Sequence, residues 1–346
     1  MSAVQEVVSE TPAIEAAPRK VMALGPMASL IVLALLISTP LFVKNFIIFQ
    51  MTMWLIYAIA VLALNILTGG SGQFSLGQSA FYAVGAYTSA ILMEHFNVNY
   101  ALTLPVAGVL CFGAGFLFGQ PALRLSGVYL ALATFALATA MPQLLKLGLF
   151  EHWTGGVQGL VVPKPDAPFG LPMSQDMWLY YFTLAISIMI YIFSVNLLKS
   201  RSGRAMMAIR DNEIAASAMG VNVALYKTLA FGVSAGITGV AGGLGAIAVQ
   251  FVAPDGYTIT LAIALFLGMV VGGVGWLPGS LVGAAFIVFV PNIAEGISKG
   301  LSGAVFGVIL IIIIFLVPHG ARQVAQNAGR LFSRLENKGR SPSSRV

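Results

Sequence analysis

Hydrophobic residues divide the chain into long apolar stretches separated by short polar or glycine-rich segments. Each stretch has about the 20 largely apolar residues that an α-helix needs to cross a bilayer. The apolar runs are continuous and do not alternate with polar residues, which favours helices over strands. We therefore expect an all-α polytopic membrane protein with about ten transmembrane helices. The predicted spans are residues 24–43, 46–68, 77–94, 100–119, 125–146, 177–198, 228–251, 259–276, 280–297 and 302–318.

Two of these spans leave their arrangement open. Only a Gly/Pro corner near Pro278 divides residues 259–276 from residues 280–297. A helical hairpin and one broken helix both fit this pattern.

The overall composition supports placement in a membrane. Of the 346 residues, 58% are hydrophobic and only 9% are charged, whereas about a quarter of an ordinary soluble domain is charged. Cys111 is the only cysteine, so no disulfide can form within the chain. Soluble globular, disordered and disulfide-stapled proteins are excluded on these grounds.

The positive charges indicate how the chain is oriented. If both termini are cytoplasmic, all but four of the 18 lysine and arginine residues fall on the cytoplasmic side, as the positive-inside rule requires. The net charge of +6 therefore has a topological explanation, and we expect no nucleic-acid partner. The exceptions are Lys44, Lys146, Lys164 and Lys299.

This topology predicts three regions. Residues 1–20 form a polar cytoplasmic tail without the apolar core of a secretory signal. Residues 21–320 form the transmembrane domain, with an outer loop at 147–176 and a cytoplasmic segment at 199–227. Residues 321–346 form a basic cytoplasmic tail, for which we expect binding to anionic lipid headgroups.

Reactive side chains are sparse. No acidic, basic or histidine side chain lies near the middle of a predicted span, which argues against a proton relay and less strongly against sodium coupling. His95, His152 and His319 do not have metal-ligand spacing, and the chain has no phosphate-binding P-loop. We expect no catalytic residue, no metal site and no cofactor in this chain.

Uncharged polar residues on three of the spans are the candidates for contact with a solute. Such side chains also form hydrogen bonds between neighbouring helices, and the sequence leaves both roles open. A pathway lined in this way would be neutral and weakly selective. The residues are Asn65, Gln78, Ser79, Tyr82, Tyr87, Tyr129 and Thr134.

Small residues recur at a spacing of four, which places them on one helix face and allows two backbones to approach closely. These faces serve either as fixed packing surfaces or as surfaces that slide during transport. The pairs are Gly85 and Ser89, Gly115 and Gly119, Gly232 and Gly236, and Gly239 and Gly243.

A glycine pattern also occurs twice between spans. Residues 69–72, followed by Gly77, have the same arrangement of glycines as residues 272–275, followed by Gly279. Both corners fall on the cytoplasmic side of the predicted topology, which is consistent with a parallel internal repeat.

The cytoplasmic segment contains a short helix by its capping signals. We expect it at about residues 212–219, with Asp211 or Asn212 as the N-cap and Gly220 in a left-handed conformation at its end. It would present Ala215 and Ala216 as a small face. Insertion into a partner's groove and an ordinary solvated loop both remain open.

The same segment resembles the coupling loop of ATP-binding-cassette (ABC) importer permeases, whose pattern is Glu-Ala-Ala, three residues, Gly. Ala215, Ala216 and Gly220 match this pattern, but Ile214 stands where the acid is expected and Glu213 lies one place earlier. The segment is most similar to the branched-chain amino-acid permeases. The resemblance assigns coupling to an ATPase to Gly203, Arg204, Arg210, Asp211, Asn212, Glu213, Ala215, Ala216 and Gly220.

Four further motifs resemble that family and occur in its order, which favours the M-type of its two permease types. They are residues 72–87, 124–131, 154–160 and the corner from 272 to 283.

The resemblance implies an ABC importer permease fold in a bacterial inner membrane. It also implies a sister permease subunit, two cytosolic ATPases that bind ATP and magnesium, and a periplasmic binding protein. Leucine, isoleucine and valine are the implied solutes. The alternatives are a sodium-coupled or facilitative secondary transporter, or an ABC permease for urea, amides or aromatic acids.

Overall fold

A computed structural model of the chain describes residues 33–123, 125, 127–168 and 173–297, with short pieces at 307–309, 311–312, 315 and 320–321. The predicted N-terminal tail, the span 302–318 and the C-terminal tail lie wholly or largely outside the described residues, as does the first part of the span 24–43.

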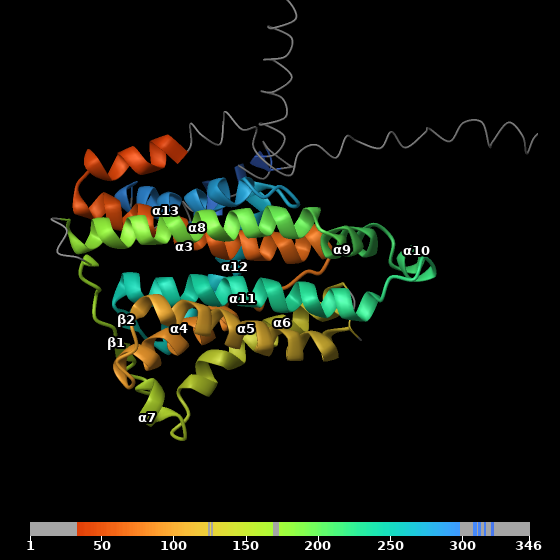
Figure 1. Ribbon diagram of the computed structural model, residues 1–346, viewed down its shortest axis with the longest axis horizontal. Coiled ribbons are helices and arrows are strands. Elements are labelled where there is room, and N and C mark those ends of the chain that lie inside the picture. Colours follow the sequence, from red (N-terminus) through yellow and green to blue (C-terminus); the bar gives the residue numbers. More distant parts are fainter. Residues whose placement is uncertain are drawn as a thin grey trace, which may run out of the picture.

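Helices make up nearly all of the described structure (Figure 1). The long helices lie side by side, with α7 near one end of the bundle and α10 at the opposite end. In chain order the elements are η1 (Thr39–Leu41), α3 (Asn45–Asn65), η2 (Ile66–Gly70), α4 (Gln78–Glu94), α5 (Tyr100–Ala122), α6 (Val128–Leu145), α7 (Glu151–Thr154), β1 (Leu160–Val161), α8 (Gln175–Lys199), α9 (Arg201–Asp211), α10 (Glu213–Ala218), α11 (Val223–Val249), β2 (Phe251–Val252), η4 (Pro254–Tyr257), α12 (Ile259–Gly272) and α13 (Gly279–Ile297).

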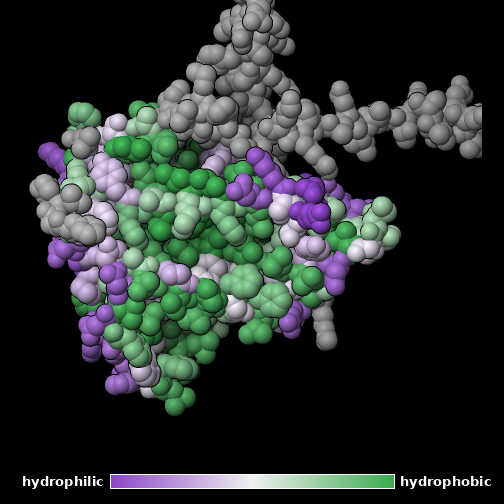
Figure 2. Space-filling view, in the orientation of Figure 1, coloured by the Kyte–Doolittle hydropathy of each residue, from purple (hydrophilic) through white to green (hydrophobic). Residues whose placement is uncertain are grey.

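Seven helices in the described part of the chain are long and apolar enough to cross a membrane, by length and composition. Helix α4 has 17 residues and is not among them, but it coincides with the predicted span 77–94. Figure 2 shows a broad hydrophobic band over the middle of the molecule, with hydrophilic residues gathered toward the two ends. The protein is therefore a mostly helical, multi-pass membrane protein.

Helices α12 and α13 form a hairpin, which decides between the two arrangements that the sequence left open. Helix α12 ends at Gly272 and α13 begins at Gly279. The helices then pack along each other, and Gly283 lies directly against the backbone of Gly268. A Cβ atom at Gly283 would overlap the Gly268 backbone, and one at Gly268 would overlap the Ile287 side chain, so the glycines allow the close crossing.

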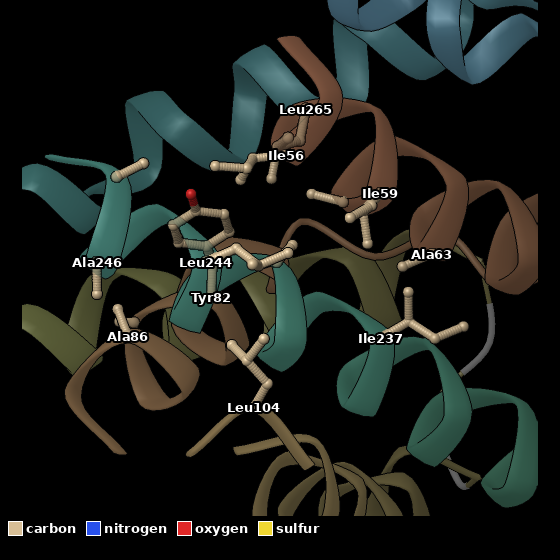
Figure 3. Packing of buried hydrophobic residues seen from close by; sticks show 14 of the residues in the cluster. Ile56, Ile59, Ala63, Tyr82, Ala86, Leu104, Ile237, Leu244, Ala246 and Leu265 are labelled. Atoms are coloured by element: carbon tan, nitrogen blue, oxygen red, sulfur yellow. The ribbon is translucent and has the colours of Figure 1, made fainter. Parts of the chain in front are cut away.

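Helix α11 is the central element of the bundle. It packs against α3, α4 and α5, and 89% of its most apolar part is buried. Figure 3 shows Ile237 and Leu244 of α11 among side chains of α3, α4 and α5, including Ile59, Tyr82 and Leu104.

The small-residue pairs explain how α11 fits between its neighbours. A Cβ atom added at Gly85 would overlap the backbone of Gly239, and one added at Gly115 would overlap the side chain of Ala235. In this structure these faces are tight packing surfaces, which is one of the two roles that the spacing allows.

Opposite the α10 end, a short antiparallel sheet ties the loop after α7 to the chain that follows α11. Leu160 pairs with Val252 and Val161 pairs with Phe251. Gly159 lies against the carbonyl of Val252 with a φ of +74°, so the glycine of this motif allows the loop to approach the second strand.

Candidate functional site

The candidate site lies at the α10 end, where α9 and α10 leave the bundle and return to it. Helix α8 ends at Lys199, and the hydroxyl of Ser200 caps α9 by accepting from the Gly203 N–H at 3.3 Å. Gly203 lies directly against the backbone of Leu197 and Leu198. The predicted coupling residue Gly203 therefore permits the sharp turn from α8 into α9.

The short helix predicted from capping signals is present as α10. Asn212 is the N-cap, and its Oδ1 accepts from the Ala215 N–H at 3.0 Å. Gly220 follows the helix with a φ of +82°, the left-handed conformation expected there. Of the two candidate caps, Asn212 rather than Asp211 fills the position.

The exposed face of α10 differs from the expected one. Ala215 is exposed, but Ala216 is buried because α10 packs on α9 and α11. The prediction that the helix presents both alanines is therefore wrong for Ala216. Ile214 and Met219 are the large apolar side chains on the outside, 81% and 85% exposed. The tip of the segment thus offers an apolar surface to whatever lies beyond it.

Glu213 holds α10 to the bundle. Its Oε2 accepts from Lys227 Nζ at 2.6 Å, which links the start of α10 to the start of α11. The backbone carbonyl of Lys227 in turn accepts from Gln73 Nε2 at 3.0 Å. Sequence reasoning assigned no role to Lys227, although it belongs to the motif that resembles the family.

Arg204 and Arg210 point in different directions. Arg204 Nη1 donates to the Lys199 carbonyl at 2.8 Å, a bond within the same segment. Arg210 Nη1 donates to the Gly69 carbonyl at 2.6 Å, and its Nη2 donates to Asp211 Oδ1 at 2.8 Å. Arg210 therefore connects the segment to the bundle beneath it.

The two glycine-rich corners meet beside Arg210. A Cβ atom at Gly69 would lie 2.5 Å from the Gly275 nitrogen, so the corners touch through their backbones. Gly72 and Gly275, which occupy equivalent places in the two patterns, have similar positive φ angles of +74° and +78°. Another equivalent pair differs, because Gly273 has a φ of +101° whereas Gly70 lies in the helical turn η2. The internal repeat therefore stays a prediction.

Asn65 fastens the second corner to the first. Its Oδ1 accepts from the Gly275 N–H at 2.7 Å, and its Nδ2 lies 3.1 Å from the Trp276 carbonyl and 3.3 Å from the Gly273 carbonyl. The side chain is buried. The structure thus places this predicted pathway residue in a clamp between helices.

Gln78 and Thr134 also have protein partners. Gln78 Nε2 donates to Ser234 Oγ at 2.9 Å, and its Oε1 accepts from Thr238 at 2.7 Å, which joins α4 to α11. Thr134 Oγ1 accepts from the Leu76 N–H at 2.9 Å and so fixes the loop before α4 onto α6. Both residues connect elements of the bundle.

The four remaining predicted pathway residues lie in three different surroundings. Ser79 and Tyr87 are buried, and their hydroxyls have no hydrogen-bond partner among the described residues. Tyr82 lies between Tyr57 and Tyr257, with ring centroids 6.4 and 5.9 Å away. Tyr129 lies apart from these residues and is 70% exposed on α6.

A polar hollow of about 290 Å³ lies between the first glycine corner and the α9–α10 turn. Its walls include Ser71 to Phe74, Arg210 to Glu213 and Lys227. Neither here nor elsewhere in the described ranges does a cluster of three or more His, Cys, Asp or Glu side chains lie close enough to hold a metal ion. The ion pairs of Arg210 with Asp211 and of Lys227 with Glu213 lie at this hollow.

Comparison with known proteins gives one family. Residues 46–314 match the family model described as branched-chain amino acid transport system / permease component. The high-affinity branched-chain amino acid transport system permease protein LivM of Escherichia coli (strain K12) is 34% identical over 273 residues, which cover 72% of this chain and 63% of the relative. LivM of Salmonella typhimurium is 35% identical over 248 residues, which cover 65% of this chain and 58% of the relative.

A more distant relative belongs to a different import system. The autoinducer 2 import system permease protein LsrC of Salmonella typhi is 26% identical over 246 residues, which cover 66% of this chain and 67% of the relative. The chain thus matches about three fifths of the length of the two LivM proteins. No solved structure matches it.

Proposed function

The chain belongs to the branched-chain amino acid transport system permease family, and from this premise we propose that it is the permease subunit of an ABC importer. It would form half of the transmembrane pathway for leucine, isoleucine, valine or a related small solute. The observation that carries the proposal is α10, a capped helix of six residues at the tip of the α9–α10 segment, with Ile214 and Met219 exposed.

A helix this short is unstable alone in water, so its own contacts must hold it in place. The Glu213–Lys227 pair and the Asn212 cap do so on the bundle side. Ile214 and Met219 are exposed on the other side. Burying them in a groove of a partner would remove their apolar surface from water, which favours binding. We propose that this partner is a cytosolic ATPase.

The same proposal includes the other subunits of the transporter. Two ATPase subunits bind ATP and magnesium, a sister permease forms the other half of the pathway, and a periplasmic binding protein delivers the solute. The chain lies in a bacterial inner membrane with about ten spans and with both termini in the cytoplasm. Movement of the ATPases would displace α10 and rock the helices between outward and inward openings.

The buried hydroxyls of Ser79 and Tyr87 are the strongest candidates for the solute pathway. Within the part of the chain that the structure describes, neither hydroxyl has a hydrogen-bond partner, and an unpaired buried hydroxyl is unfavourable. Opening of the bundle would give them water or solute to pair with. Asn65, Gln78 and Thr134 already bond to other helices or loops and, in this proposal, hold the walls together.

The first experiment is co-purification of the tagged chain from gently solubilised membranes. We expect two P-loop ATPases and a homologous permease to accompany it. Recovery of the chain alone, with transport in liposomes that needs no ATP, would instead establish the alternative of a secondary transporter. The binding protein from the same assembly would then be tested with leucine, isoleucine, valine, urea and amides.

The exposed face of α10 can be tested by introducing a negative charge on it. We predict that Ile214→Glu or Met219→Glu lowers affinity for the ATPase by about 30-fold or more, the equivalent of about 2 kcal/mol, because a buried carboxylate would replace an apolar contact. Gln120→Glu, an exposed position at the end of α5, is the control and should leave the affinity unchanged. Equal ATPase recovery with all three variants would rule out α10 as the docking element.

A further inference from the structure

We propose that Arg210 and Asn65 are positioning residues that link motion of the α9–α10 segment to the α12–α13 hairpin. The link runs from the Arg210 guanidinium to the Gly69 carbonyl, across the contact of Gly69 with Gly275, and through the Asn65 side chain. This inference rests on the proposed function, since it concerns how movement at α10 reaches the transmembrane helices.

The first step is the attachment of the segment to the bundle. Arg210 is the next-to-last residue of α9, two positions before the Asn212 cap of α10. Its guanidinium is held on one side by Asp211 Oδ1, at 2.8 and 3.1 Å, and on the other side donates to the Gly69 carbonyl at 2.6 Å. A planar guanidinium can bond in two directions at once, which a lysine ammonium does with less geometric control.

Packing around Arg210 restricts the side chain. Gly72 has a positive φ, and a Cβ atom there would lie 3.0 Å from Arg210 Cγ, so the loop backbone lies close against the arginine stem. The guanidinium also passes near Gly275 of the second corner. Arg210 is thus seated where the two glycine corners come together.

The second step crosses between the corners. Gly69 lies in η2, a π-helical turn that continues α3. Single π-helical turns within α-helices are frequent at functional sites. Because a Cβ atom at Gly69 would lie 2.5 Å from the Gly275 nitrogen, the backbones already touch, and movement of the first corner toward the second would displace it.

The third step is the buried clamp. Asn65 uses its amide oxygen on the Gly275 N–H and its amide nitrogen on the Trp276 carbonyl. The side chain is 1% exposed, so water cannot replace these bonds without opening the contact. The clamp joins the end of α3 to the turn between α12 and α13.

The ion pair of Glu213 with Lys227 supplies a contrast. It connects α10 to the beginning of α11, the next element of the chain, and the Glu213 side chain is 53% exposed. The Arg210 bond reaches a residue 141 positions away, and Asn65 reaches residues more than 200 positions away. The long-range connections, rather than the local ion pair, join the segment to a distant hairpin.

The test is uptake per ATP hydrolysed in the assembled transporter carrying Arg210→Gln or Asn65→Leu. We expect assembly with the ATPases and ATP hydrolysis to stay within about twofold of the wild type, while uptake per ATP falls about tenfold or more. Arg210→Lys should recover part of the coupling. Arg201→Gln, an exposed arginine at the start of α9, is the matched control and should keep the wild-type ratio.

A double variant tests whether the two residues belong to the same link. If Arg210 and Asn65 serve the same link, Arg210→Gln with Asn65→Leu should be no less coupled than the worse single variant. Unchanged uptake per ATP in Arg210→Gln would overturn the inference. So would a parallel loss of hydrolysis and uptake, because that result indicates damage to assembly alone.

A second measurement separates this inference from the proposed function. In the purified chain, Arg210→Gln should increase amide hydrogen exchange at residues 272–279, and Arg201→Gln should not. Failure of the wild-type chain to bind any ATPase would refute the proposed function but leave this prediction standing. Unchanged exchange at residues 272–279 would refute the link itself.

Discussion

Three glycines shape the turn that follows α7, and each has a positive φ: +69° at Gly155, +56° at Gly156 and +74° at Gly159. Gly155 also lies directly against the Gly159 backbone. A side chain at Gly155 would meet both an unfavourable backbone conformation and a steric overlap. These glycines are therefore needed for the conformation of the backbone and supply no reactive side chain.

We predict that Gly155→Ala destabilises the protein by about 2 kcal/mol and lowers its melting temperature by a few degrees. Thermal unfolding of the detergent-solubilised chain measures the effect. Gly148→Ala is the control, because no atom lies within 4 Å of a Cβ atom at that position and its φ is not positive. Equal melting temperatures for the two variants would contradict the packing argument.

Asn65 shows why single residues were harder to assign than spans. Its polarity within an apolar stretch marked it as unusual, and a solute contact was one reading. Its partners are Gly275 and Trp276, more than 200 positions away, and no local pattern predicts that juxtaposition. Lys227, although part of the family motif, received no role for the same reason, since its partner Glu213 belongs to another helix.

At the scale of elements, α10 was predictable because its signals are local. Asn212 and Gly220 determine its ends through their own backbone and side-chain bonds. The face that it buries was not predictable, because Ala215 and Ala216 are chemically identical and only the packing on α9 and α11 distinguishes them.

The ion pair that supports α10 should contribute little. We predict that Glu213→Gln reduces ATPase affinity by less than about fivefold, because partly exposed ion pairs contribute about 0–1 kcal/mol. Titration of the detergent-solubilised permease with ATPase measures this, with Ile214→Glu as the strongly impaired comparison. A loss in Glu213→Gln as large as in Ile214→Glu would mean that the carboxylate itself contacts the partner.

The crossing of α4 and α11 depends on having no side chain between the backbones. We predict that Gly85→Ala destabilises the bundle by about 2–3 kcal/mol, since its Cβ would overlap the Gly239 backbone. Gly113→Ala on α5, where no neighbour lies within 4 Å, is the control. Thermal unfolding of the two variants measures the difference. Equal melting temperatures would show that α4 and α11 can move apart to accommodate the methyl group without loss of stability.

At the scale of the whole molecule, orientation can be tested with single cysteines. Cys111 is buried, so the native chain should give little background with a membrane-impermeant maleimide. We predict that Val157→Cys is labelled in cells whose outer membrane is permeable, whereas Ser217→Cys is labelled only in inverted vesicles. Both positions are exposed. The opposite labelling pattern would invert the proposed topology.

Hydropathy located the helices of the described bundle because burial in lipid and burial against helices impose the same apolar requirement. It did not decide between a hairpin and a broken helix at residues 259–297, since both bury the same side chains. The close approach of Gly268 and Gly283 decides this, and it depends on the two helices folding back on each other.

The central position of α11 also bears on the order in which the protein is made. The ribosome completes α3, α4 and α5 well before residue 223, so the three helices enter the membrane while the helix that fills the space among them is still missing. Until α11 is released from the insertion machinery, their glycine and alanine faces lack the neighbour that covers them in the finished protein. Nascent chains stalled before α11 should therefore be recognised as incomplete by membrane proteases.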